Sequence, residues 1–171
     1  MGLATFIGGI HPFEGKELSE DKPIKYLEPL QGEVMVYPLS QHIGAPAKPL
    51  VAKGDHVLKG QIIAEAGGFI SANVLSSVSG TVKGIESKLV ANGAMVQSIL
   101  VENDGEEEAI EGFGTDRDAS KLSKEEIRQI VKDAGIVGLG GAGFPTHVKL
   151  TPKDENAIDY VIVNGAECEP Y

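Results

Sequence analysis

Two short segments near the end of the printed sequence carry the residues best suited to bind a ligand. The first, residues 138–145, reads GLGGAGFP and is followed by Lys149. Consecutive glycines leave backbone N–H groups uncovered, and a helix that begins at Pro145 would add positive potential. Phe144 could cover a planar ring. The segment therefore predicts an anion-binding loop, with a flexible or tightly packed glycine turn as the open alternative.

The second segment, residues 164–170, reads NGAECEP and follows the apolar run 159–164, which predicts a buried strand. Open α/β sheets bind their ligands at the carboxyl ends of strands. Asn164, Glu167 and Cys168 could therefore hydrogen-bond a heterocycle. In the alternative interpretation, the acids of this segment are solvated and the thiol is half-buried.

The elements that must position these segments begin with a well-marked helix. Ser123 and Glu126 form a capping box, apolar residues follow at helical spacing, and Gly135 ends the helix. Pro145 suits the first position of a second, short helix. These elements predict the start of an α/β domain over residues 122–171. They cannot bury both faces of a sheet, so we expect the chain to be part of a longer protein.

Upstream, residues 30–102 contain short β-rich runs broken by glycine, which predict a small barrel or sandwich and an α+β fold class for the whole chain. Gly54 and Gly60 allow positive φ at turns. Residues 1–29 predict an extended arm, and the acidic residues 103–121 a linker. The four clearest strand predictions are 33–37, 61–64, 79–83 and 98–101.

The spacing V-x-x-G-D-x-V-x-x-G-Q over residues 51–61, followed by VSGTV at 78–82, resembles the barrel-sandwich hybrid fold of biotinyl and lipoyl carrier domains. Carriers hold a lysine at a hairpin tip, where this chain has Phe69. Without an amine, neither biotin nor lipoate can be attached, so a scaffold or docking role follows. Phe69 and Ile70 form either an exposed tip that contacts a partner or a pair buried against the N-terminal arm.

Composition excludes several classes of function. The 171 residues include 25 acidic and 15 basic side chains, a net charge of −10, which speaks against nucleic acid as a partner. A single cysteine allows no intrachain disulfide and no Cys-ligated zinc or iron–sulfur site. No apolar run approaches the ~20 residues of a membrane span, so any membrane contact is expected to be peripheral. Four histidines lack metal-ligand spacing and are expected to be structural or on the surface: His11, His42, His56 and His147.

The segments GLGGAGFPTHVKL and VIVNGAECEPY resemble the FMN and NADH site of the NADH-binding flavoprotein subunit of respiratory complex I. The stretches TFIGGIHPFEGK, PLSQHIGAPAKPLVAKGDHVLKGQIIAE, SVSGTVKGIE and ILVENDG resemble RnfC, a component of the Rnf electron-transport complex, along nearly the whole chain. This resemblance implies a membrane-associated oxidoreductase that moves electrons between ferredoxin and NAD and couples them to ion transport. The protein would be peripheral at the cytoplasmic face, with the other Rnf subunits and ferredoxin-linked carriers as partners.

The resemblance also implies cofactor roles for nine residues. Four glycines would line the phosphate and ring of FMN, Lys149 would lie near the phosphate, and Phe144 would stack on the nicotinamide of NADH. Three residues of the second segment would contact the flavin. The glycines are Gly138, Gly140, Gly141 and Gly143, and the three flavin contacts are Asn164, Glu167 and Cys168.

Two departures from complex I weaken the implied hold on FMN, because Leu139 replaces an arginine and Ala166 an aspartate. The family's 4Fe-4S clusters need cysteine motifs that this chain lacks, so they are expected in another part of a longer protein. No residue is an obvious general acid or base, and the chain alone is expected to be inactive. The rival hypothesis is a non-catalytic scaffold or docking module of the same kind of complex.

Overall fold

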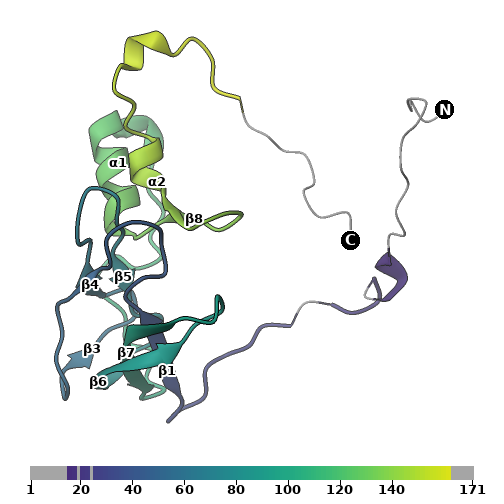
Figure 1. Cartoon of the computed structure of the whole chain (residues 1–171), viewed down its shortest axis with the longest axis vertical. Coiled ribbons are helices and arrows are strands. Elements are labelled where there is room, and N and C mark those ends of the chain that lie inside the picture. Colours follow the sequence, from purple (N-terminus) through teal and green to yellow (C-terminus); the bar gives the residue numbers. More distant parts are fainter. Residues whose placement is uncertain (1–14, 19, 24, 163–171) are drawn as a thin grey trace. The chain divides into compact units, whose positions relative to one another are not determined.

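The computed structural model describes residues 15–18, 20–23 and 25–162. The chain divides into two compact units, one formed by residues 28–157 and the other by residues 1–27 together with 158–171. The larger unit contains the strands and α-helices labelled in Figure 1. In the smaller unit, a 3₁₀ turn spans Lys16–Leu18, and the Lys22 ammonium donates to the Leu18 carbonyl at 2.6 Å.

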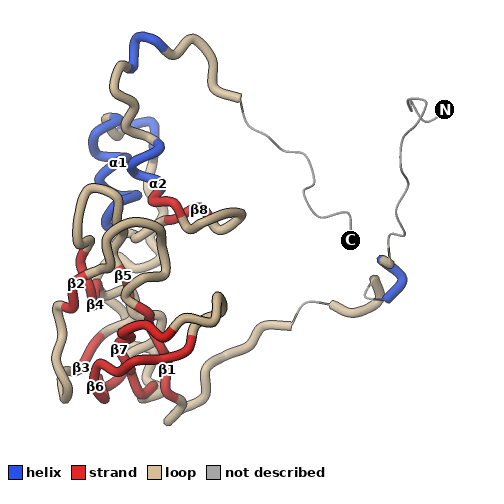
Figure 2. The backbone as a smooth tube through the Cα atoms, in the orientation of Figure 1, coloured by secondary structure: helices blue, strands red, loops and turns tan. Residues whose placement is uncertain are grey.

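Two antiparallel sheets build the β-rich part of the larger unit (Figure 2). The first has four strands in the order β1-β7-β6-β3, and the second has three in the order β2-β4-β5. All four predicted strands are present, but β6 and β7 extend well beyond the predicted runs. The strands of the first sheet are β1 Val34–Pro38, β3 His56–Val57, β6 Gly80–Leu89 and β7 Met95–Asn103, and those of the second are β2 Lys48–Pro49, β4 Ile62–Glu65 and β5 Val74–Leu75.

Apolar side chains from both sheets share one core. Ile63 of the second sheet and Ile99 and Val101 of the first are fully buried in it. Each such side chain contributes about 1.5–3 kcal/mol through removal from water. Gly54 and Gly60 have φ of +96° and +82°, which confirms the turns predicted at these positions.

The hairpin tip between β4 and β5 exposes Phe69 to 75% and Ile70 to 39%. Ser71 fixes the base of this tip. Its hydroxyl accepts from the Gly67 N–H at 2.9 Å and donates to the Ala45 carbonyl at 2.7 Å. The apolar tip is thus presented on a braced hairpin.

The acidic segment 103–121 is tied to the barrel at its start. Asp104 accepts a hydrogen bond from the Ser79 hydroxyl at 2.6 Å, and its other oxygen lies 2.8 Å from His56 Nε2. The pKa of Asp104 falls from 3.8 to about 2, because the Ser79 hydroxyl, the Glu106 N–H and His56 all stabilise the carboxylate. This carboxylate anchors the segment to β3 and to the residue that precedes β6.

Helix α1, Lys124–Asp133, begins as predicted. The Ser123 hydroxyl accepts from the Glu126 N–H, and the Glu126 carboxylate accepts from the Ser123 N–H at 2.8 Å. Gly135 follows the helix with φ +62°, which confirms the predicted stop. A Cβ at Gly135 would lie 2.4 Å from the Asn73 carbonyl oxygen, so this end of α1 rests directly on the barrel.

The next elements differ from the prediction. Strand β8, Val137–Gly138, pairs antiparallel with β9, Phe144–Pro145, and α2 covers Thr146–Lys149. Pro145 is the N-cap of α2 and not its first helical residue, so that prediction was wrong by one position. Pairing with Val137 holds Pro145 at ψ 121°, an extended value, and the helix can begin only afterwards.

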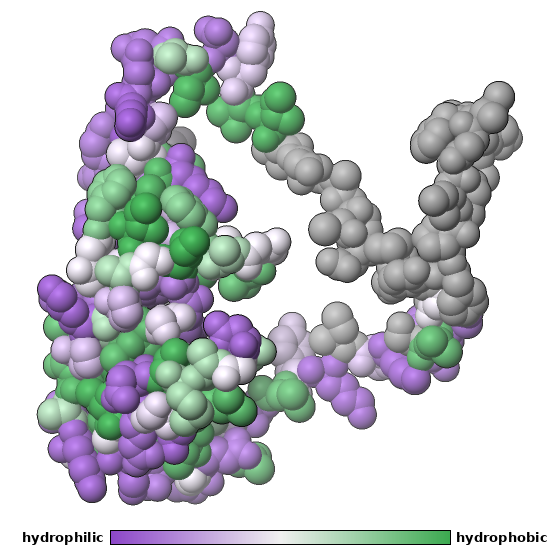
Figure 3. Space-filling view, viewed as in Figure 1, coloured by the Kyte–Doolittle hydropathy of each residue, from purple (hydrophilic) through white to green (hydrophobic). Residues whose placement is uncertain are grey.

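The predicted strand at 159–164 is wrong for residues 159–162, which have no regular structure. Tyr160 and Val161 are 86% exposed and Ile162 is 90% exposed; Figure 3 shows this hydrophobic run directly before the grey residues. A buried strand needs backbone partners on its edges. No strand in the described ranges pairs with this run. Residues 163 and 164 lie outside the described residues.

Candidate functional site

The glycine loop, residues 139–143, connects β8 to β9 and projects from the end of that short ladder (Figure 1). Its last residue packs against the barrel. The Ile43 N–H donates to the Gly143 carbonyl at 3.4 Å, and a Cβ at Gly143 would lie 2.9 Å from the Gln41 carbonyl oxygen. With φ +66°, Gly143 is required by the fold itself. The barrel therefore fixes one end of the loop.

Gly140 and Gly141 are glycines of a different kind. A Cβ at either would meet nothing within 4 Å, and neither has a positive φ. Their backbone N–H groups donate no hydrogen bond within the described part of the chain. Because the fold requires glycine at neither position, these residues leave room and free donors for a ligand that approaches the backbone closely. The loop thus fits the phosphate and ring of FMN.

A positive charge lies beside the first glycine of the segment. The Lys149 ammonium is 5.8 Å from the centroid of the Phe144 ring, and a Cβ at Gly138 would lie 2.8 Å from that ammonium. In the residues described, no carboxylate lies within 4.0 Å of it. The structure brings Gly138, Phe144 and Lys149 together, as the ligand-binding interpretation requires. Asn164, Glu167 and Cys168 lie outside the described residues.

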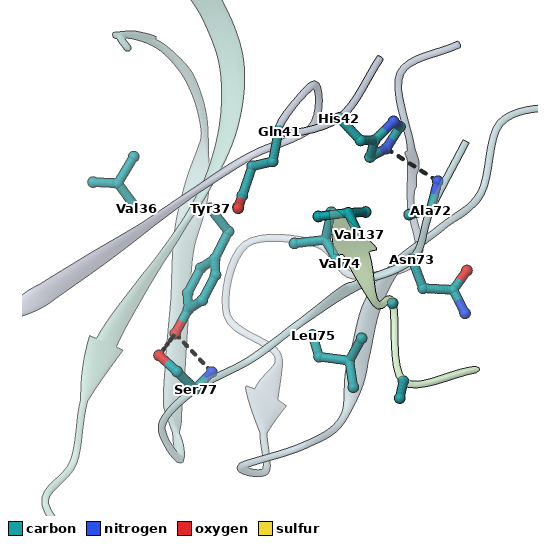
Figure 4. Close-up of a pocket in the computed structure, with 12 residues that line it drawn as sticks. Val36, Tyr37, Gln41, His42, Ala72, Asn73, Val74, Leu75, Ser77 and Val137 are labelled. Atoms are coloured by element: carbon teal, nitrogen blue, oxygen red, sulfur yellow. Dashed lines mark hydrogen bonds between the residues drawn. The ribbon is translucent and has the colours of Figure 1, made fainter. Parts of the chain in front are cut away.

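A cavity of about 770 Å³ lies between the glycine loop and the barrel, within the usual size range of ligand sites. Three segments line it: residues 137–139 and 141–143, the barrel residues around Gln41, and the turn 90–92 between β6 and β7. A smaller cavity of about 410 Å³ shares four of these residues (Figure 4). The shared residues are Val36, Gln41, His42 and Val137.

His42 is a structural residue at the edge of both cavities. It is 7% exposed, and its Nε2 accepts a hydrogen bond from the Ala72 N–H at 3.2 Å (Figure 4). Its Nδ1 lies 3.2 Å from the Ile43 carbonyl oxygen, which assigns the proton to Nδ1. Both ring nitrogens are therefore engaged by the backbone, in line with the prediction for this histidine.

The other described histidines also have local roles. His56 faces Asp104, and burial, followed by the nearby Lys132, lowers the pKa of His147. Within residues 15–18, 20–23 and 25–162, no group of three or more His, Cys, Asp or Glu could hold a metal ion. None of the helices described is long and apolar enough to cross a membrane.

Sequence reasoning did not identify the barrel side of this site. Gln41 lies in a stretch that supports the family resemblance but has no ligand-binding pattern, and Asn92 lies in a loop without a motif; they precede the glycine loop by about 100 and 50 residues. They reach the cavity only through tertiary packing, so no local spacing could have indicated them.

Comparison with known families decides the assignment. Residues 4–106 match the family model of the RnfC barrel sandwich hybrid domain. The chain belongs to the RnfC family. Residues 131–171 match the model of the Nuo51 FMN-binding domain, so the RnfC barrel is followed by the flavin-type segment that the sequence predicts. The α+β fold class and the resemblance to RnfC are both confirmed.

Similar proteins carry names consistent with this family. The chain is 46% identical over 169 residues to the C subunit of the proton-translocating ferredoxin:NAD(+) oxidoreductase complex of Clostridium ljungdahlii, covering 99% of the chain and 36% of that protein. It is 45% identical over 170 residues to the Na(+)-translocating counterpart of Acetobacterium woodii, covering 98% of the chain and 37% of that protein. The chain therefore spans about a third of the length of these relatives.

Proposed function

We propose that this chain is the N-terminal part of an electron-transfer subunit of an ion-translocating ferredoxin:NAD oxidoreductase complex, and that its glycine loop holds FMN. The observation that carries the proposal is the open backbone at Gly140 and Gly141, in a loop whose flanking residues Gly138 and Phe144 lie beside the Lys149 ammonium. FMN, when bound, supplies the exchange of a hydride with NADH and of electrons with further carriers.

The residues of the chain bind and orient the cofactor. The uncovered N–H groups of the loop hydrogen-bond its phosphate, and Lys149 neutralises that charge. Phe144, next to the ammonium, covers the nicotinamide of NADH, while Asn164, Glu167 and Cys168 contact the flavin. Leu139 is 90% exposed and offers no charge where complex I has arginine, so we expect FMN to be held less tightly than in that relative.

The remaining parts of the proposed assembly lie outside this chain. The 4Fe-4S clusters belong to the rest of the full-length protein, which docks on the other Rnf subunits at the cytoplasmic face of the membrane and exchanges electrons with ferredoxin-linked carriers. No step of proton chemistry is assigned to a side chain of the described residues.

Titration of FMN, followed by flavin fluorescence, tests the proposal in this chain and in the full-length protein. Saturable quenching by the chain means that its two segments already form the site. Quenching by the full-length protein alone means that the site is shared with downstream residues. Absence of quenching in both proteins contradicts the proposal.

A second role, docking, is favoured by Phe69. This side chain is 75% exposed at the tip where carrier domains hold their lysine, and the hairpin below it is braced by Ser71. We expect Phe69→Ser to weaken retention of the protein by its complex and to leave FMN affinity unchanged. If the complex retains the variant to the same extent as the wild type, the docking role is contradicted.

A further inference from the structure

We propose that the barrel forms one wall of the flavin site and that Gln41 positions the neutral ring system of the bound flavin. This inference rests on the proposed function. It gives the barrel a direct part in cofactor binding, beyond the scaffold role that the loss of the carrier lysine indicates.

The cavity between loop and barrel is lined by neutral groups. None of the described residues that line it is Lys, Arg, Asp or Glu. Its polar side chains are Ser40, Gln41, His42 and Asn92. His42 is engaged by the backbone, and Asn92 already accepts the Ala94 N–H at 2.9 Å. The barrel side of this lining suits a neutral heterocycle, because it supplies no cation for a phosphate.

Gln41 is well placed to meet that heterocycle. It lines both cavities, and its side chain points into the smaller one, between Tyr37 and Val137 (Figure 4), so the edge of the ring would meet it where the two cavities join. The Tyr37 hydroxyl is held by the Ser77 N–H at 3.0 Å, whereas the Gln41 amide makes no hydrogen bond within the described ranges. An amide offers both a donor and an acceptor, which matches the alternating N–H and C=O groups on the pyrimidine edge of a flavin.

The backbone of Gln41 is fixed relative to the glycine loop. Its carbonyl oxygen is the atom nearest to a Cβ placed at Gly143, and the adjacent His42 is locked by two hydrogen bonds. Lys149 does not line the cavity and lies instead beside Gly138 at the start of the loop. The site therefore has a cationic end for phosphate and a neutral end for the ring.

FMN carries the phosphate and riboflavin lacks it, so comparing the affinities of these two ligands tests the two ends of the site separately. In the full-length protein, we expect Gln41→Leu to weaken FMN and riboflavin by the same factor, about tenfold, because the lost contact is to the ring. Lys149→Ala should weaken FMN and leave riboflavin unchanged. Gln97→Leu, an exposed glutamine of β7, is the matched control and should change neither. Binding is read by flavin fluorescence, and unchanged thermal midpoints exclude a folding defect.

Gln41→Glu tests the same contact with the packing volume retained, and it should also weaken both ligands. Unchanged affinity for both ligands in the two Gln41 variants overturns the inference while wild-type FMN binding keeps the proposed function. A loss confined to FMN also overturns it, because Gln41 would then act on the phosphate. If wild type binds neither ligand, the proposed function fails and the inference fails with it.

Discussion

The barrel and the glycine loop both contain apolar residues and glycines, but these residues differ in burial and in backbone conformation between the two regions. In the barrel, apolar side chains such as Ile63 and Ile99 are fully buried, and glycines such as Gly60 occupy positions with positive φ that the fold demands. In the loop, Leu139 is 90% exposed, and Gly140 has neither a positive φ nor a neighbour within 4 Å of a Cβ. Glycines that the fold does not require are the better markers of a binding site.

The largest expected effect lies in the barrel core. Ile99→Ala removes a fully buried side chain and should lower the free energy of unfolding by about 2–5 kcal/mol. Leu89→Ala, 71% exposed on β6, is the control and should change it by less than about 0.5 kcal/mol. Chemical denaturation of both variants measures the difference. Equal, small losses would mean that the barrel does not depend on this core.

A second test separates the two kinds of glycine. Gly135→Ala places a Cβ 2.4 Å from the Asn73 carbonyl at a residue with φ +62°, so we expect a loss of about 2 kcal/mol. Gly140→Ala meets no neighbour and should lose less than about 0.5 kcal/mol. Thermal melting of the two alanine variants checks this ranking. If Gly140→Ala lowers the stability as much as Gly135→Ala does, the glycine loop is a structural turn and not an open binding loop.

The smallest effect concerns the anchor of the acidic segment. Because the pKa of folded Asp104 is about 2 and its ordinary value is 3.8, its ionised form stabilises the fold above about pH 4. That contribution is lost as the pH falls through about 2. Asp104→Asn should cost on the order of 1 kcal/mol at neutral pH and flatten the stability profile between pH 4 and 2. Glu111→Gln, in the same segment, is the control. A profile unchanged by Asp104→Asn would show that Asp104 does not hold the segment.

Locally encoded features were predictable from the sequence. The capping box of Ser123 and Glu126 and the stop at Gly135 depend on neighbouring residues alone, and the structure reproduces them. Four of the seven barrel strands, β1, β4, β6 and β7, could be predicted because glycine turns separate their apolar runs, whereas the two-residue strands β2, β3 and β5 were not predicted. Pro145 was misplaced because its conformation follows from pairing with Val137, which local spacing does not indicate.

The ligand site could be predicted only in part. The glycines and Lys149 lie close in sequence, so their spacing pointed to an anion site. Gln41 joins them only through the packing of Gly143 on the barrel, which depends on tertiary structure. The run 159–162 has the composition of a buried strand, but composition does not supply the neighbouring strands that such an element needs.

The most direct test of the account is the dissociation constant of FMN for the full-length protein with Gly140→Val. Because the valine would occupy space that the fold leaves empty, we predict a loss of at least about a hundredfold, equivalent to about 2.7 kcal/mol, at an unchanged melting temperature. Gly68→Ala, whose Cβ would make an ordinary contact at 3.4 Å with Ala45, should bind FMN as wild type does. Unchanged FMN affinity in Gly140→Val would contradict the assignment of the glycine loop as the flavin site.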